Sequence, residues 1–127
     1  MKFVICIFLF VSFQTVAKQI SDLNWKKRLL IISYSQIEFQ IFTKVNKFID
    51  DNKCKIDDRN IEIIFYNKFK NQKFITPKFI MNKYGIWLIG YDGQIKDYSP
   101  NEEIFVRLFD VIDSMPMRKN EITNSKC

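Results

Sequence analysis

Histidine is absent from the 127-residue sequence. Its absence excludes catalytic dyads and triads that use an imidazole as general base, and metal sites that need a histidine ligand. Cysteine is scarce, with Cys6, Cys54 and Cys127 far apart in the chain, so there is no closely spaced redox pair. The common forms of imidazole-assisted and dithiol chemistry are therefore excluded.

Glycine and proline are also scarce, with three of each, whereas apolar residues make up 47% of the chain and aromatic residues 16%. This composition is sufficient for a core and argues against disorder, and the length allows one domain. The net charge is +6, but basic and acidic residues are interspersed, with Lys26-Lys27-Arg28 as the densest cluster. That pattern favours a solvated surface over a nucleic-acid interface.

The first residues have the pattern of a secretory signal. Lys2 precedes an apolar run over residues 3–13, and Thr15-Val16-Ala17 follows. A positive start, a short apolar run and small residues before a cut are typical of a removable leader, and the run is too short to span a bilayer. We expect a signal peptide over residues 1–17, cleaved after Ala17, and a secreted or periplasmic protein without a stable membrane anchor.

Two continuous apolar runs, residues 28–34 and 61–66, predict strands that are covered on both faces. Between them, apolar residues recur at three or four positions from Ile37 to Ile49, which predicts an amphipathic helix. Ser35 and Glu38 have the spacing of a capping box at its start. The polar segment that follows, residues 50–60, predicts a loop, so the two strands should be parallel with a right-handed crossover.

The second half of the domain predicts a short helix, a hairpin and a final helix. Thr76-Pro77 is a helix-start pair, and the turn dipeptide Asp92-Gly93 predicts a hairpin over residues 86–98. Ser99-Pro100 then predicts the start of the last helix.

The last helix has an apolar stripe from Ile104 to Met115, and Pro116 is expected to end it. Arg118 and Lys119 would then lie near the negative end of its dipole. The domain should cover residues 18–121 and leave a tail at 122–127. The predicted fold is α/β and thioredoxin-like, βαβαββα, with a mixed four-stranded sheet flanked by helices.

Three stretches of the sequence together resemble one family. They are ISDLNWKKRLLIIS at residues 20–33, WLIGYDGQIK at 87–96 and IDSMPMRKNE at 112–121. They are similar to the family called domain of unknown function 4174, a small secreted domain that also occurs beside sushi repeats in extracellular-matrix proteins. The resemblance implies a peroxiredoxin- or thioredoxin-like fold but no settled activity. Its signature residues here would be Met115, Pro116, Met117 and Arg118.

Thioredoxins and peroxiredoxins carry their reactive cysteine near the start of the helix after the first strand, where the helix N-terminus stabilises a thiolate. The matching segment here, YSQIEFQ, has no cysteine, and Ser35 without a base is a poor nucleophile. The segment before the third strand, NKYGIW, has Gly85 and lacks the cis-proline of thioredoxins. We therefore predict no catalytic residue and no cofactor.

Cys54 is the remaining candidate thiol. Lys53 and Lys55 beside it would lower its pKa, whereas nearby aspartates oppose this effect. Those aspartates lack the order of a calcium-binding loop, so no metal site is predicted. Cys54 could form a disulfide with Cys127, because export permits disulfides. Free thiols without a specific role are the favoured interpretation.

Trp25, Lys26 and Arg28 form a candidate partner surface, although packing of Trp25 over the sheet edge is the favoured interpretation of that residue. The leading hypothesis is a non-catalytic, exported binding module. Its partner would be an envelope protein, an extracellular-matrix component or a small anionic ligand, and not a nucleic acid. One alternative is a thiol or redox accessory protein that uses Cys54. Another is a basic protein that binds anionic polymers in a salt-dependent way.

Overall fold

The structure is a computed structural model that describes residues 19–34, 39–67, 75, 77–80, 83–122 and 127. The predicted leader with Ala17 and the capping box of Ser35 and Glu38 lie outside these residues, as does Thr76. Within the described ranges, no helix has the length and apolar character that a membrane span requires.

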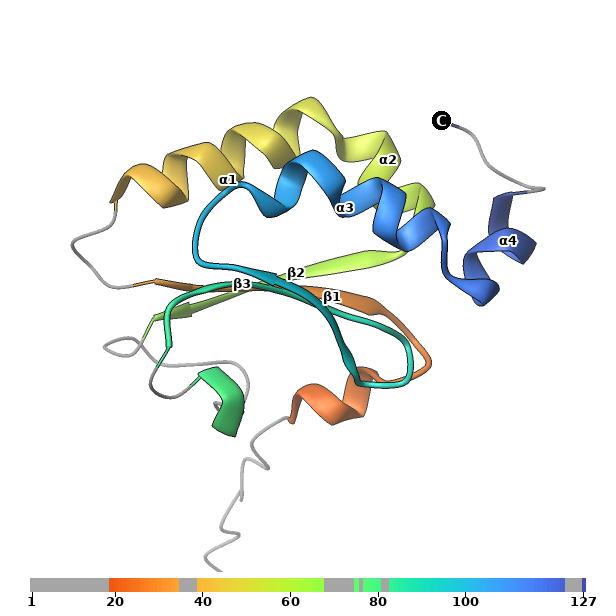
Figure 1. Cartoon of the computed structure of the whole chain (residues 1–127), viewed down its shortest axis with the longest axis horizontal. Helices are drawn as coiled ribbons and strands as arrows, with labels where there is room; N and C mark the ends of the chain where they lie inside the picture. Colours follow the sequence, from red (N-terminus) through yellow and green to blue (C-terminus); the bar gives the residue numbers. More distant parts are fainter. Residues whose placement is uncertain (1–18, 35–38, 68–74, 76, 81–82, 123–126) are drawn as a thin grey trace, which may run out of the picture.

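A mixed four-stranded sheet forms the centre of the molecule (Figure 1). Its strands are β1 (Arg28–Tyr34), β2 (Ile61–Asn67), β3 (Gly85–Ile89) and β4 (Ile95–Ser99), in the order β2-β1-β3-β4. β1 pairs in parallel with β2 and antiparallel with β3, which pairs antiparallel with β4. The predicted α/β class and mixed sheet flanked by helices are confirmed, and the topology is compatible with a thioredoxin-like fold.

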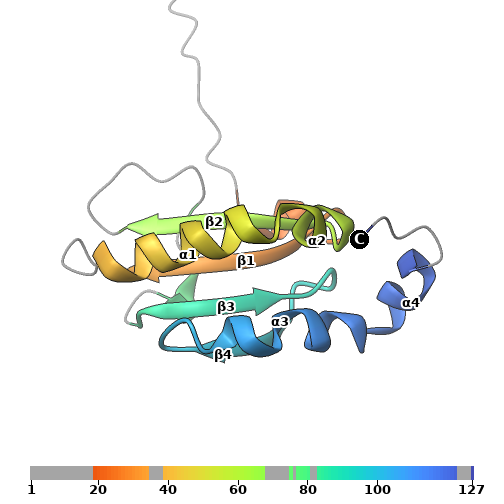
Figure 2. The same ribbon diagram turned by 90° about the horizontal axis from the view of Figure 1, so that it is seen from above.

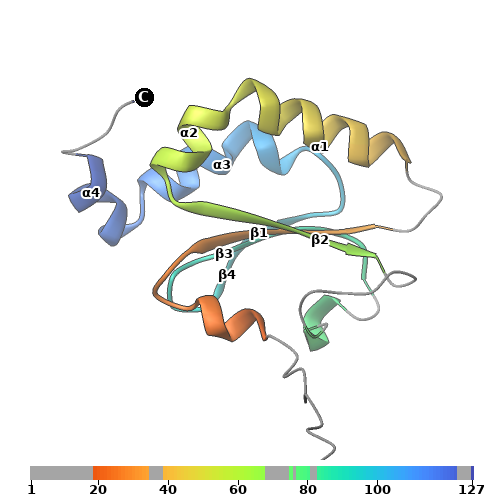
Figure 3. The ribbon, with the colours of Figure 1, turned by 180° about the vertical axis from the view of Figure 1, so that it is seen from behind.

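Three α-helices lie on one face of this sheet, and two 3₁₀ helices lie on the other (Figures 1 and 3). The first group comprises α1 (Phe39–Asp51), α2 (Lys53–Asp58) and α3 (Ile104–Asp113), and the second comprises η1 (Ile20–Leu23) and η2 (Lys78–Ile80). Seen from above, α1 runs over β1 and β2, and α3 runs over β3 and β4 (Figure 2). The short helix α4 (Pro116–Ile122) lies beyond one end of the sheet.

Because β1 is central, its side chains supply both layers of the core. Leu30 and Ile32 face the three α-helices, where Leu108 of α3 is fully buried. Leu29 and Ile31 face the 3₁₀ helices, together with Trp87. This alternation explains why the strand reads as a continuous apolar run: a strand that is covered on both faces has no polar side.

The helix boundaries differ from the sequence prediction at three places. The segment predicted as a polar loop contains α2, which is anchored by the buried Ile56. α3 begins at Ile104 and not at Pro100, because Ser99 still belongs to β4 and its hydroxyl accepts the Asn101 N–H at 3.3 Å. Pro116 does follow the end of α3, but it also begins α4.

Leu108 provides a test of the layer under α3. Leu108→Ala should lower the free energy of unfolding by about 2–5 kcal/mol, because it leaves a cavity among fully buried side chains. The matched control is Val106→Ala on the same helix. It should change the free energy of unfolding by less than about 0.5 kcal/mol, because Val106 is 89% exposed. Urea unfolding followed by circular dichroism measures both. Equal effects of the two variants would contradict the described packing.

Candidate functional site

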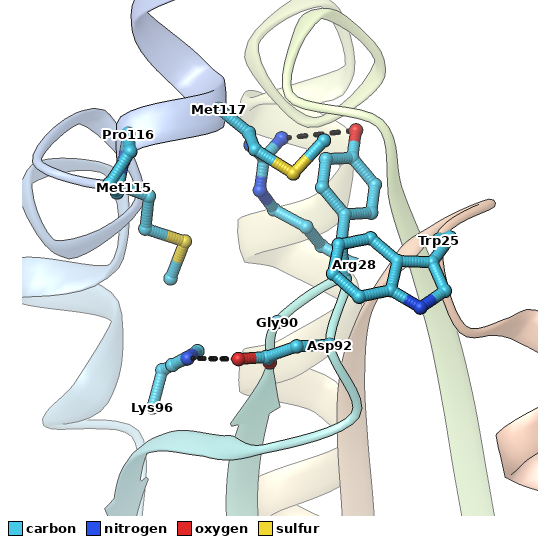
Figure 4. A pocket seen from close by; sticks show the side chains of 9 residues that line it. Trp25, Arg28, Gly90, Asp92, Lys96, Met115, Pro116 and Met117 are labelled. Atoms are coloured by element: carbon cyan, nitrogen blue, oxygen red, sulfur yellow. Dashed lines mark hydrogen bonds and ion pairs between the residues drawn. The ribbon is translucent and has the colours of Figure 1, made fainter.

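A pocket of about 290 Å³ lies at the end of the sheet where β1 begins (Figure 4). Its wall comes from the segment before β1, from the β3–β4 hairpin and from the junction of α3 and α4. The lining residues are Trp25, Arg28, Gly90, Tyr91, Asp92, Lys96, Met115, Pro116 and Met117. The reactive corner of thioredoxins lies after β1, at the start of the next helix, so this pocket occupies the opposite end of the sheet.

Trp25 forms one rim of the pocket. Its backbone N–H donates to the Tyr91 carbonyl at 2.7 Å, which ties the segment before β1 to the hairpin. Its φ of 66° lies in the left-handed region, which bulky residues rarely adopt. The side chain is 68% exposed, so the expectation that Trp25 packs over the sheet edge is wrong. The Trp25 indole is therefore largely exposed to solvent at the edge of the pocket.

The α3–α4 junction forms the facing wall. Pro116 cannot continue α3 but is suited to the first turn of α4, so the chain turns between the two helices. This turn places Met115 and Met117 at the pocket (Figure 4). Three of the four predicted signature residues thus line it. The fourth, Arg118, is directed into the protein, where it is 2% exposed.

Arg118, which the sequence places near the negative end of the last helix dipole, is the centre of a network of ion pairs. Its Nη2 lies 2.6 Å from Asp58 Oδ2, and its Nε lies 3.1 Å from Asp113 Oδ1. Its Nη1 also donates to the Asp58 carbonyl and lies 3.4 Å from Glu121 Oε2. Arg59 donates through Nε and Nη2 to both oxygens of Asp113, at 3.0 and 2.9 Å.

Arg28 joins this network to the pocket. Predicted as part of a surface, it is instead fully buried. Its Nη1 lies 2.9 Å from Glu121 Oε2, 2.7 Å from the Arg59 carbonyl and 3.3 Å from the Tyr91 hydroxyl. The guanidinium carbon lies 4.3 Å from the centre of the Tyr91 ring. Lys26 is exposed and does not line the pocket; its carbonyl accepts a hydrogen bond from Asn60 Nδ2.

The network keeps its acids ionised. Burial alone would raise the pKa of Glu121, but hydrogen bonds from Arg28 and Tyr91 outweigh this and hold the pKa below its usual value. Burial likewise opposes ionisation of Asp113, yet hydrogen bonds from Arg59 and Arg118 lower its pKa. Three arginines and three carboxylates, those of Asp58, Asp113 and Glu121, therefore balance one another.

Cys54 and Cys127 are joined in a disulfide. This differs from the favoured sequence interpretation of two free thiols. Cys54 lies in α2, just after α1, and both cysteines are exposed. The bond ties the end of the chain to α2, which the Arg118–Asp58 ion pair also links to α4. It lies at the carboxyl end of α1, away from the position of a thioredoxin-type cysteine.

At the thioredoxin-type corner, the described residues place an aromatic ring beside Gly85. Gly85 pairs with Ser33 near the end of β1 and has a φ of +147°. A Cβ at this position would lie 2.6 Å from both the Tyr98 ring and the Ser99 carbonyl oxygen. Glycine is therefore needed at position 85, because the Tyr98 side chain and the Ser99 carbonyl oxygen fill the space.

Sequence reasoning found part of this site. It singled out Trp25, Arg28 and the signature residues, but not that they meet at one end of the sheet. It missed Asp58 and Arg59, which lie in the segment taken for a solvated loop. Tyr91 and Glu121 lie inside the stretches that carry the family resemblance. That resemblance was the sequence signal that could have identified them as residues of the site.

The structure thus describes an α/β domain that is compatible with a thioredoxin-like fold and has a pocket at the end of the sheet where β1 begins. The family model described as domain of unknown function (DUF4174) matches residues 19–121, and the chain belongs to this family. No curated protein and no solved structure matches the sequence.

The partly buried acids Asp113 and Glu121 predict an acid-labile fold. Ionised Asp113 and Glu121 stabilise the protein above their ordinary pKa values of about 3.9 and 4.3, and this contribution is lost as the pH falls through their lower folded values. Asp113→Asn should destabilise the protein at neutral pH and make the loss of stability below about pH 4 less steep. Thermal unfolding between neutral and acidic pH measures this. Asp110→Asn, on the exposed side of the same helix, is the control; an unchanged slope for Asp113→Asn would contradict the network.

The disulfide predicts a second loss of stability. Cys54→Ser should lower the free energy of unfolding by about 2–4 kcal/mol, because the bond closes a loop between residues separated by 73 positions. A reductant should destabilise the wild type similarly and leave Cys54→Ser unchanged. Alkylation of the native protein without reductant, followed by mass spectrometry, should label neither Cys54 nor Cys127. Labelling of both would show that the thiols are free.

Proposed function

We propose that the protein is an exported, non-catalytic binding module and that the pocket beside Trp25 is its binding site. The observation that carries this proposal is the combination of an apolar wall, an exposed aromatic rim and a buried cation at one small cavity. Such sites are typical of ligand recognition, where apolar contacts supply affinity and a few polar groups fix orientation. The partner expected from the sequence, an envelope or matrix protein or a small anionic ligand, would dock at this rim.

The titratable side chains that line the pocket favour binding over catalysis. Burial, the largest influence, raises the pKa of the Tyr91 hydroxyl, which is therefore protonated at neutral pH. A hydrogen bond from Lys96 lowers the pKa of Asp92, which makes its carboxylate a weak base. Arg28 is a permanent cation, and Lys96 is paired with Asp92 at 2.9 Å. These groups can hold a ligand, but they do not form an acid–base pair poised near neutral pH.

Export is supported by two independent features. The sequence begins with the pattern of a removable leader, and cleavage after Ala17 would release the domain that the family model matches. An exposed disulfide such as Cys54–Cys127 persists in oxidising compartments and is rare in reducing ones. The same exposed disulfide favours a second candidate function, a redox accessory that exchanges this bond with a partner thiol.

An NMR titration with phenylacetamide and phenylacetate, one neutral and one anionic, tests the binding function. At least one should shift the Trp25 indole N–H and the Gly90 and Asp92 amides more than the amides of Ser33 and Gly85 at the opposite end of β1. Met117→Trp should weaken binding because a larger side chain fills the pocket. Val106→Trp, on exposed α3 surface, should have no effect. The absence of pocket shifts with both compounds would overturn the proposal.

A further inference from the structure

The charged side chains that line the pocket are already paired within the protein. Lys96 Nζ lies 2.9 Å from Asp92 Oδ2, and Nη1 of the fully buried Arg28 lies 2.9 Å from Glu121 Oε2. A charged group that entered the pocket would lose its hydration without meeting an unpaired charge in the described wall, which is unfavourable. The interior of the pocket therefore selects an uncharged group.

The apolar wall of the pocket favours an aromatic ring. Met115, Met117 and Trp25 surround the space from different segments of the chain (Figure 4). Thioether sulfurs make favourable contacts with aromatic rings, and two aromatic rings pack well edge to face or offset. The volume of about 290 Å³ is close to the lower limit of ligand pockets, about 300 Å³. The space is thus suited to one aromatic side chain and not to a large ligand.

The backbone that carries Trp25 is fixed before any partner arrives. The hydrogen bond of 2.7 Å from its N–H to the Tyr91 carbonyl holds it at a φ of 66°. The preceding Asn24 packs against the hairpin turn, where a Cβ at Gly93 would lie 2.8 Å from the side-chain nitrogen of Asn24. Bulky residues rarely adopt this backbone conformation, and such conformations concentrate at binding sites. An exposed tryptophan on a fixed backbone is a typical anchor of a protein interface.

The rim of the pocket carries positive charge. Lys26 follows Trp25, and Lys119 lies one turn after Pro116 on α4, so both lysines adjoin residues of the wall, and both are exposed. Neither forms an ion pair with a described residue, because the acids of the neighbouring network are paired with arginines and Asp92 is paired with lysine. Carboxylates beside an uncharged anchor would therefore meet two cations, and the net charge of +6 would favour their approach.

We propose that the pocket is the docking site for an acidic protein segment that carries an aromatic side chain. The ring enters between Met115, Met117 and Trp25, and carboxylates that flank it in the segment pair with Lys26 and Lys119. This inference rests on the proposed binding function and specifies the chemistry of the partner. An anionic polymer without aromatic groups would match only the rim, and a neutral aromatic compound would match only the interior.

A series of blocked peptides tests both parts of this partner. The parent is acetyl-Glu-Glu-Phe-Glu-Glu-amide, and the others replace the phenylalanine by alanine, the phenylalanine by cyclohexylalanine, or every glutamate by glutamine. NMR titration of the wild type, at low and at high salt, measures the affinities and locates the shifts at the Trp25 indole and at the Gly90 and Asp92 amides.

Each replacement should weaken binding for a separate reason. Alanine should cost at least about tenfold, because the buried ring is lost. Cyclohexylalanine should cost about two- to tenfold, because the sulfur–aromatic contacts are lost. Glutamine should cost at least about threefold at low salt, and this difference should shrink at high salt because exposed ion pairs are screened.

Charge-reversal variants test the position of the carboxylates. Lys26→Glu and Lys119→Glu should each weaken binding of the parent peptide at low salt and leave the glutamine peptide unchanged. Lys47→Glu, at an exposed position of α1, makes the same change in net charge away from the pocket and is the matched control. Thermal unfolding checks that each variant folds, and the peptide series on the wild type tests the proposal if one does not. Equal losses in Lys26→Glu and Lys47→Glu would show attraction by overall charge alone and would overturn the assignment of the rim.

The outcomes separate this inference from the binding function. If phenylacetamide shifts the pocket amides but the parent peptide does not, or if the glutamine peptide binds as tightly as the parent at low salt, the module has its binding site and the acidic partner is overturned. If the alanine or the cyclohexylalanine peptide binds as tightly as the parent, the aromatic anchor is overturned; for alanine the protein is then a binder of anionic polymers. If neither the parent peptide nor the two phenylacetyl compounds shift the pocket, both proposals are overturned.

Discussion

The ion pair between Arg118 and Asp58 connects the two halves of the domain at one end of the sheet. Asp58 ends α2, which belongs to the parallel half of the fold, and Arg118 belongs to α4 after the antiparallel half. Both side chains are nearly buried, and removal of one partner from such a pair typically costs about 3–5 kcal/mol. The position of α4, and with it one wall of the pocket, depends on this contact.

The contacts around this pair explain why the far C-terminus forms part of the site. Asp113 accepts from both Arg59 and Arg118, and Glu121 links Arg118 to Arg28. Asp113 and Glu121 are each shared by two guanidinium groups, so α3, α4, α2 and the start of β1 are fixed relative to one another. The Cys54–Cys127 bond reinforces the same junction from outside. Rigid support of this kind lets a small pocket keep its shape without a ligand.

The structure gives each of the four predicted signature residues, Met115 to Arg118, a definite place. In MPMR, the proline turns the chain, the two methionines face the pocket, and the arginine enters the ion network. One short sequence therefore supplies both a wall of the pocket and an arginine of the network that supports it. The thioredoxin-type corner, by contrast, has Tyr98 packed where a Cβ at Gly85 would lie. The pocket lies at the other end of the sheet, where β1 begins.

Local periodicity and turn residues report which segments are buried, so they predict the strands and the main helices. The family was recognised separately, from the resemblance of three stretches of the sequence. The apolar run of β1 and the stripe of α3 are examples that the structure confirms. The sequence does not predict that α2 is a helix, because a single apolar residue, Ile56, among charged residues gives no periodic pattern. The burial of Arg28 and Arg118 was decided by tertiary structure alone. From sequence, an arginine side chain is expected to be exposed. It becomes buried only where carboxylates from distant segments converge on it.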